Sequence, residues 1–528
     1  MRGGGPGRAL SALVVACLAL AGLSLLVPSA PTTDSWGWIV WGREVAHFDL
    51  NTDVGGSPAW KPLPVLFTLV FSLFDDAAPD LWLWVARAGG LLAVAAAFRL
   101  AARLAGLWAG AVAAVTLLLA GNWMRSAAHG YSEGLVAAAL LFAFECHLDG
   151  RRRAASALLL VAALARPEAC SLLGAYALYG WRREGRDPRL VIIALALVPL
   201  LWLGADWWGS GDPFHAGAAA RSVDANMSWH ELLGAGAALA GAPALVLAGA
   251  ACLVGWRQGD PRVLGLAGCV VAWTALVCGL VALGWPGAPR FLAPAVAGAC
   301  VLAGAGAART VRAAGDFPVR RLALAAVLLL ASAPAALPRA AKGADQLAVA
   351  ERRAVLEADL RDAVRASTEG LRRCGAYVLP AELGWLRGAV AWELDLPLER
   401  IAVVRRSRAL PAALARWGPV ILLDQQGHTE PLMSRASRRY AVLSYPIADP
   451  SPCVALLSPL AVRPQAIGGA PVRIRLLGRE RHWRIWAIRR RPAARQRLPA
   501  RSGAKGKGGR PGQAPAGGGG IGGPPKAG

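Results

Sequence analysis

The sequence has little charge for its length. Of its 528 residues, 17% are Asp, Glu, Lys or Arg, whereas 55% are hydrophobic. This balance excludes an ordinary soluble protein and favours a chain whose apolar segments lie in a lipid bilayer. The chain also lacks a P-loop, a Gly-x-Ser-x-Gly nucleophile motif and a Cys or His metal cluster, so nothing places it in the soluble-enzyme classes that these motifs mark.

Acidic residues are scarcer than basic ones. The chain has 33 Asp and Glu against 57 Lys and Arg, for a formal net charge of +24. Such an excess suggests nucleic acid at first sight, but no RNA- or DNA-binding motif accompanies it. The arginines gather instead in short loops between apolar runs and in the tail, where they set topology and meet anionic lipid. We therefore expect membrane lipid, and no nucleic acid, as a partner.

Apolar runs predict about eleven transmembrane helices, since a helix needs ~20 residues to cross a bilayer. The first, at 10–27, follows Arg2 and Arg8, and its length and poor cleavage site favour an uncleaved anchor over a signal peptide. A shorter run at 65–74 predicts an interfacial helix. The other spans are predicted near residues 81–98, 107–121, 134–148, 154–165, 169–180, 190–207, 232–255, 263–284, 291–308 and 321–337.

The loops between these spans alternate in charge. Arginine-rich loops are typical of the cytoplasmic side, and here they alternate with arginine-poor loops at 122–133, 166–168, 208–231 and 285–290. The alternation predicts a cytoplasmic N-terminus and places the chain from Pro338 onward outside. The fold class predicted is an all-α polytopic protein of the cell (plasma) membrane, followed by a small C-terminal extracytoplasmic α/β domain.

Composition divides the chain into three parts: a transmembrane domain at 1–340, an extracytoplasmic domain at 341–491 and a basic, Gly- and Pro-rich tail at 492–528. The second part begins with a predicted charged helix at 342–373, and its later short apolar runs predict strands. The tail is disordered by composition. Cys374 and Cys453 are the cysteines of the predicted outer domain, and a disulfide and two unpaired thiols are equal alternatives for them.

Two charged residues interrupt the apolar stretch from 154 to 180, in Arg166-Pro167-Glu168. Arginine clusters lie beyond both ends of the stretch, so we predict a hairpin of two short helices whose tip faces the exterior at shallow depth. Ionisable groups at such positions are costly and usually mark a functional site. The alternative is an Arg–Glu pair that satisfies itself and only fixes the hairpin.

Two acidic residues are catalytic candidates on the same predicted face. Asp34 directly follows the first span and is placed to act as a general base on an acceptor hydroxyl; alternatively, it caps a helix that starts at Ser35. Glu133 opens a later span, where the helix dipole alone also favours a carboxylate. Together they could hold a divalent metal ion, because carboxylates suit hard cations.

Three further basic residues are predicted near the outer membrane surface. Lys61 could contact an anion or merely snorkel from the interfacial helix. Arg87 and Arg290 lie near the outer ends of two spans and could clamp a phosphate by bidentate hydrogen bonds. Anchoring in the membrane interface is the alternative for both.

The order of these residues resembles the integral-membrane glycosyltransferases of the GT-C class, which include protein O-mannosyltransferases, lipid A aminoarabinose transferases and actinobacterial arabinofuranosyl- and mannosyltransferases. The resemblance covers residues 1–340. Leu63 interrupts the expected Pro-Pro pair, and Asp34-Ser35 stands where some relatives have two acids, which leaves metal dependence open. The motifs are Asp34, Lys61-Pro62-Leu63-Pro64, Val85-Ala86-Arg87, Ser132-Glu133, Arg166-Pro167-Glu168, Gly211-Asp212-Pro213-Phe214 and Arg290-Phe291-Leu292-Ala293-Pro294.

The resemblance implies a hexosyl- or pentosyltransferase that moves a sugar from a polyprenyl-phosphate donor to an acceptor hydroxyl on a cell-envelope glycan, lipid or protein. The roles it implies are catalysis for Asp34 and Glu133, which would also hold any metal, donor-phosphate binding for Lys61, Arg87, Arg166 and Arg290, and support for Glu168, His129 and Asp212. The alternatives are a lipid-linked-sugar translocase or transporter and a non-catalytic scaffold, although the chain shows no convincing internal repeat of the transporter kind.

Overall fold

A computed structural model describes residues 6–54, 58–184, 189–221, 227–313, 315, 318–372 and 376–404, and beyond them six strand segments between 421 and 490. Residues 1–490 group into one compact unit, and residues 491–528, a second unit, lie outside the described residues. The predicted pairing of Cys374 with Cys453 also lies outside them, so it stays a prediction.

Each predicted span overlaps a helix. Long apolar runs satisfy their backbone groups within a helix, which is the form that a bilayer permits. The first part of the chain consists of α1 (Pro6–Ser24), α2 (Thr33–Ala46), α3 (Pro62–Phe71), α4 (Ala78–Ala105), α5 (Leu107–Leu118), α6 (Trp123–Ala128), α7 (Glu133–Leu148), α8 (Arg152–Ala165), α9 (Ala169–Glu184), α10 (Arg189–Ser210), α11 (His215–Arg221), α12 (Trp229–Ala240), α13 (Ala242–Gln258), α14 (Pro261–Ala282) and α15 (Ala293–Ala313).

Not every helix is long enough to cross a membrane by itself. By length and composition, four helical stretches of the described chain qualify, or five if the bent pair α12–α13 counts as one span. The helix α5 has 12 residues, which gives about 18 Å at ~1.5 Å per residue against a hydrocarbon core of ~30 Å. The count of eleven spans therefore stays a prediction.

The span predicted at 232–255 is wrong as a single helix. The chain turns by 92° between α12 and α13, at Gly241, whose φ of +91° is one that side-chain-bearing residues rarely adopt. The Arg339 guanidinium donates hydrogen bonds to the carbonyls of Ala240 (3.1 Å) and Ala238 (2.6 Å) at the end of α12. The bend therefore has both a permissive residue and a partner for the freed carbonyls.

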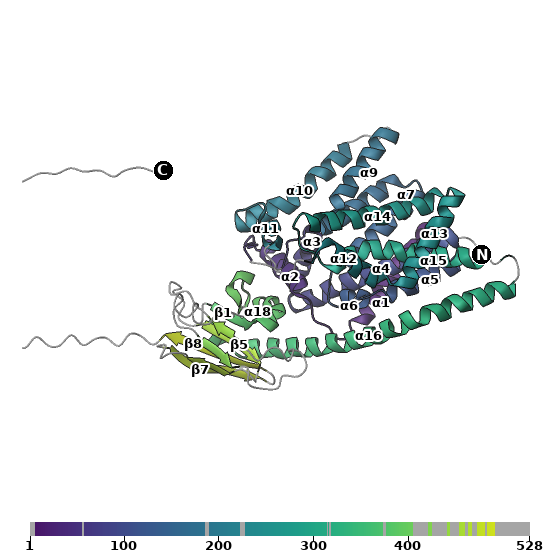
Figure 1. Cartoon of the computed structure of the whole chain (residues 1–528). Helices are drawn as coiled ribbons and strands as arrows, with labels where there is room; N and C mark the ends of the chain where they lie inside the picture. Colours follow the sequence, from purple (N-terminus) through teal and green to yellow (C-terminus); the bar gives the residue numbers. More distant parts are fainter. Residues whose placement is uncertain are drawn as a thin grey trace, which may run out of the picture. The chain divides into compact units, whose positions relative to one another are not determined.

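The last predicted span and the charged helix after it form a single element, α16 (Pro318–Ala366), of 49 residues (Figure 1). It continues through Pro334 and Pro338, and α17 (Thr368–Arg372) follows. The domain boundary predicted at 340 falls inside this helix, so the helix break assumed there is wrong. The boundary itself stays a compositional prediction.

Strands follow the long helix, as the short apolar runs predict. One sheet has the order β2-β1-β5-β8-β7, in which β1 pairs in parallel with β2 and β5, and β8 pairs antiparallel with β5 and β7. The helix α18 (Arg387–Leu394) lies between the first two strands in the chain. The strands are β1 (Ala376–Pro380), β2 (Ile401–Val404), β5 (Val454–Pro459), β7 (Val472–Glu480) and β8 (Trp483–Arg490), with β3 (Ile421–Asp424), β4 (Ala441–Leu443) and β6 (Arg463–Ala466) in a second sheet.

The small residues of α15 let its neighbours approach closely. This helix packs against α13, α5, α4, α14 and α7, and a Cβ added at Gly304 would lie 2.2 Å from the backbone oxygen of Ala109. At Gly306 the corresponding distance to the oxygen of Leu247 is 1.9 Å. Close packing of this kind drives helix association where lipid removes the hydrophobic difference.

The helix α2 packs against α18. A Cβ added at Gly388 would lie 2.3 Å from Cβ of Trp36, and Trp36 also donates from its indole nitrogen to the Glu357 carboxylate at 3.0 Å. At the other end of α2, Arg43 donates to the carbonyls of Trp392 and Leu396, each at 3.0 Å. These contacts fix the helix whose first turn carries Asp34.

The predicted topology can be tested by labelling introduced cysteines in intact cells with a membrane-impermeant maleimide. Glu399 is exposed and follows α18, and Arg183 is exposed in the last turn of α9. Alternating loop charge places the first outside and the second inside. We expect labelling of Glu399→Cys above the wild-type background in intact cells, and of Arg183→Cys only after lysis. The reverse labelling pattern would show that the topology is opposite to the one predicted.

Candidate functional site

The first turn of α2 holds Asp34 at the end of the segment that follows α1. Thr32 is the N-cap of this helix, since its side chain accepts from the backbone nitrogen of Ser35. The backbone of Thr32 in turn donates to the carbonyl of His129 at 3.1 Å. The alternative interpretation of Asp34 as the cap is therefore wrong, and its carboxylate is available for other contacts.

Arg290 joins the two catalytic candidates. Its Nη2 lies 2.9 Å from Oδ2 of Asp34, and its Nε lies 3.5 Å from Oε1 of Glu133. The short helix Pro289–Leu292 that carries it leads into α15, and the guanidinium carbon lies 4.6 Å from the centre of the Tyr131 ring. Residues 256 positions apart thus meet in one ion pair, as the ordered motifs imply.

Arg166 forms a second, more deeply buried set of ion pairs. It binds both oxygens of Glu168, at 2.7 and 3.2 Å, and reaches Glu133 of α7 at 3.2 Å. The side chains of Arg166, Glu133 and Glu168 are 4%, 3% and 9% exposed, so the charges depend on one another. Burial favours a higher pKa for the Glu168 carboxyl, but the charge and hydrogen bonds of Arg166 outweigh burial and lower that pKa.

The hairpin prediction for residues 154–180 matches the two helices α8 and α9 with Arg166-Pro167-Glu168 between them. The self-satisfied Arg–Glu pair is present as well. The pair with Glu168 is not the only contact of Arg166 among the described residues. A second ion pair joins Arg166 to Glu133 and so connects the hairpin to α7.

Lys61 precedes α3 and turns inward. Its Nζ donates to Oγ of Ser132 at 3.0 Å and lies 4.8 Å from the centre of the Trp38 ring. Burial lowers the pKa of Lys61 to about 8, and although the carboxylates of Glu133 and Asp34 act against burial, the charges of Arg166 and Arg290 add to it. A lysine that snorkels to the interface would point away from such a cluster, so that alternative is wrong.

The cluster of six charged side chains is balanced. Three carboxylates and three basic groups form it: Asp34, Glu133, Glu168, Lys61, Arg166 and Arg290. An added anion must therefore compete with a carboxylate for either arginine, whereas Lys61 donates to the Ser132 hydroxyl. Arg290 is 35% exposed and Arg166 is 4% exposed, so Arg290 is the arginine better placed to exchange partners.

Three candidates from the sequence lie in other contacts. Arg87 donates to Ser24, Val27 and Ser29, so it ties α4 to the C-terminal end of α1. Nδ1 of His129 lies 2.9 Å from the carbonyl of Ala30. Asp212 accepts from the backbone of Phe214 in the turn before α11. Within the described residues, none of the three makes a direct contact with the charged cluster.

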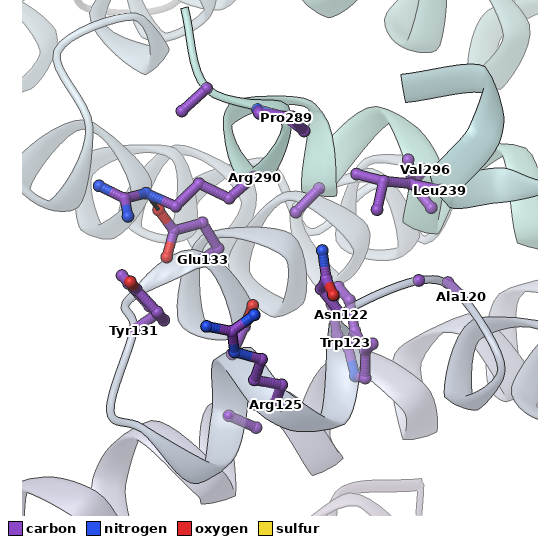
Figure 2. Close-up of a pocket in the computed structure, with 17 residues that line it drawn as sticks. Ala120, Asn122, Trp123, Arg125, Tyr131, Glu133, Leu239, Pro289, Arg290 and Val296 are labelled. Atoms are coloured by element: carbon purple, nitrogen blue, oxygen red, sulfur yellow. Dashed lines mark ion pairs between the residues drawn. The ribbon is translucent and has the colours of Figure 1, made fainter. Parts of the chain in front are cut away.

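A cavity of about 230 Å³ lies against one side of the cluster, among α6, α7, α12 and the start of α15. Figure 2 shows Arg290 and Glu133 together at this cavity, with Arg125 extending toward the space between Tyr131 and Asn122. The motif comparison missed Arg125 and Asn122. The predicted exterior loop at 122–133 was the available signal, but no motif singles out either residue.

The carboxylates nominated for a metal do not fit that role in this arrangement. Asp34 and Glu133 both bind Arg290, so a cation held between them would have to displace the guanidinium. Among the described residues, no group of three or more His, Cys, Asp or Glu side chains is placed to hold a metal ion.

The sequence matches no known family profile, and no curated protein is detectably similar to it in sequence. Solved structures do match. ArnT from Cupriavidus metallidurans bound to undecaprenyl phosphate is 13% identical with a TM-score of 0.52, over 91% of this chain and 98% of that chain. The same protein in the apo state gives 14% and 0.51, over the same shares of both chains. The apo oligosaccharyltransferase from Archaeoglobus fulgidus gives 12% and 0.43, over 82% of this chain and 75% of that one. The chain has the GT-C-like glycosyltransferase fold seen in ArnT.

Proposed function

We propose that this protein transfers a sugar from a polyprenyl-phosphate donor to an acceptor hydroxyl on the extracytoplasmic face of the plasma membrane. The observation that carries the proposal is the Asp34–Arg290 pair. It places a carboxylate that can act as a base 2.9 Å from a guanidinium that can bind phosphate. Lys61 adds a second cation to the same cluster. The fold supports the donor class, because the matching ArnT structure holds undecaprenyl phosphate.

The reaction breaks the bond between the sugar's anomeric carbon and the phosphate oxygen. The acceptor oxygen forms the new bond to that carbon, and its proton passes to the Asp34 carboxylate. The phosphate leaves with the bonding electron pair as polyprenyl phosphate and gains one negative charge. Because Asp34 loses one negative charge at the same step, the total charge of the site is unchanged. Lys61 and Arg290 stabilise the charge on the leaving phosphate.

Arg290 links donor binding to activation of the base. In the ligand-free arrangement its guanidinium holds the Asp34 carboxylate. A donor phosphate offers the same guanidinium an alternative charge-assisted contact. When Arg290 turns to the phosphate, Asp34 loses a cationic partner and becomes more basic. Proton transfer therefore follows donor binding and does not precede it.

The buried side chains give Arg166 a positioning role. Its donors are already shared between Glu168 and Glu133, and its guanidinium lies 4.0 Å from the centre of the Phe291 ring, beside Arg290. It holds the hairpin tip, α7 and the start of α15 in register. Arg87 has a comparable role at the end of α1, since both of its Nη groups donate hydrogen bonds there.

Asp34→Asn tests the base. We expect normal abundance and sugar transfer reduced about 10²-fold or more, the scale of a lost general base. Binding of the donor should persist, because the variant leaves Arg290 and Lys61 in place. The measurement is transfer from the polyprenyl-phosphate-sugar pool of isolated membranes, normalised to protein. Asp53→Asn is the matched control, since Asp53 is 71% exposed and lies after the same helix. Wild-type transfer by Asp34→Asn would rule out this base.

Arg166→Ala and Glu168→Ala separate structure from function at the hairpin. Arg166→Ala leaves the buried Glu168 carboxylate unpaired, which costs on the order of 3–5 kcal/mol of stability. Glu168→Ala should cost less, because Arg166 keeps its ion pair with Glu133. The double variant removes both charges and should recover abundance. Transfer should stay low, because Glu133 still lacks Arg166. Recovery of both abundance and transfer would show that the pair only stabilises the hairpin.

The pKa of Lys61 predicts a pH dependence. The ammonium group binds phosphate when protonated, and its pKa of about 8 means that this form declines as pH rises through that value. We expect kcat/KM for the donor, which reports on the free enzyme, to fall above that pH. Lys61→Arg keeps its charge throughout the range and should flatten this limb, even if its absolute activity is lower. An unchanged limb in Lys61→Arg would assign the titration to another group.

A further inference from the structure

The cavity contains a positive charge that the proposed chemistry does not use. Arg125 of α6 lines the cavity and is exposed, and among the described residues it makes no ion pair with a carboxylate. Arg290, on the same cavity, is bound to Asp34 and Glu133. The uncompensated charge at the cavity is therefore that of Arg125.

A second arginine lies near Arg125. Arg353 of α16 is near enough for its charge and that of Arg125 to repel each other, and α16 packs against α6. Its guanidinium lies 5.3 Å from the centre of the Trp385 ring, and its buried Nε has no hydrogen-bond partner among the described residues. Arg353 does not line the cavity, but its charge adds to that of Arg125 and so favours an anion, which Arg125 can bind by charge-assisted hydrogen bonds.

Glu133 gives the cavity a polar acceptor at its other side. One oxygen binds Arg166 and Arg290, whereas the buried Oε2 has no hydrogen-bond partner within the described chain. A hydroxyl group can donate to this oxygen only if the side chains around it move, because the oxygen itself is buried. Leu239 and Val296 add apolar surface to the lining (Figure 2). The cavity thus offers an arginine that is unpaired within the described residues, the side chain of Glu133 and an apolar wall.

We propose that this cavity is the acceptor site, and that the acceptor carries an anionic group, a phosphate or a carboxylate, which Arg125 binds. The acceptor assignment rests on the proposed transferase function. The cavity of about 230 Å³ is smaller than the ~300–1,000 Å³ typical of sites for drug-sized ligands. It therefore holds one small unit of the acceptor, with the rest outside.

The charge of the cavity can be measured without substrate. Ser126 lines the cavity, and Ser126→Cys places a thiol there. We compare its modification rates with an anionic sulfonatoethyl and a cationic trimethylammonioethyl methanethiosulfonate, each normalised to a free thiol. Mass spectrometry of the peptide that carries residue 126 separates this thiol from the native cysteines. The protein is the full chain in lipid nanodiscs.

We expect the anionic reagent to react faster, and the ratio of the two rates to fall about threefold or more on adding Arg125→Gln, as loss of a local potential predicts. Arg221→Gln is the matched control. Arg221 is also exposed, but it lies over the Trp285 ring and outside the cavity lining. A ratio that Arg125→Gln leaves unchanged would overturn the anion site.

Two further measurements test the acceptor assignment. Undecaprenyl phosphate, as a probe of the donor lipid, should not slow the reaction of uncharged methyl methanethiosulfonate with the thiol of Ser126→Cys; full protection would make the cavity a donor site. Labelled product from the membrane assay should bind an anion exchanger, and phosphatase and phosphodiesterase sensitivity distinguishes a phosphate from a carboxylate. A neutral product overturns the anionic acceptor. If no product forms in any variant, the transferase function fails, while the reagent ratio still decides the anion site.

Discussion

The site depends on one guanidinium shared between carboxylates from distant parts of the chain. Arg290 precedes α15, whereas its partners Asp34 and Glu133 begin α2 and α7. Because charges placed near a membrane are costly unless paired, this contact requires three helix starts to meet at one place. Arg166 extends the same requirement to the α8–α9 hairpin through Glu133. The geometry of the charged cluster is thus held by electrostatic pairing.

The same pairing explains how a balanced cluster can handle an anionic lipid. Both arginines of the cluster are already paired with carboxylates, so a phosphate binds either of them by exchange of partners. Exchange is least costly at Arg290, which is more exposed than Arg166 and adjoins the cavity. The buried ion pairs of Arg166 keep the helices in place while Arg290 exchanges its partner. In the proposed reaction, Arg166 thus serves stability and Arg290 serves turnover.

Much of the helical framework could be predicted from the sequence, because long apolar runs form helices in a bilayer and arginine-rich loops are typical of its cytoplasmic side. The bend at Gly241 was missed because the apolar pattern continues through it. The continuity of α16 was missed because Pro338 and the change to charged residues read as a boundary. Motif order grouped Asp34, Lys61, Glu133, Arg166 and Arg290 correctly. Motif order could not distinguish Arg87 from them. An arginine that donates to backbone carbonyls and an arginine that binds phosphate are the same residue in a sequence.

The length of α16 has a mechanical consequence. Its 49 residues span about 74 Å at ~1.5 Å per residue, more than twice the ~30 Å of hydrocarbon in a bilayer. If its apolar first half is embedded, its charged second half must project beyond the lipid as a strut. That projecting half carries Glu357, which binds Trp36 two residues after Asp34. A displacement of the sheet that follows α16 would therefore be transmitted to the first turn of α2.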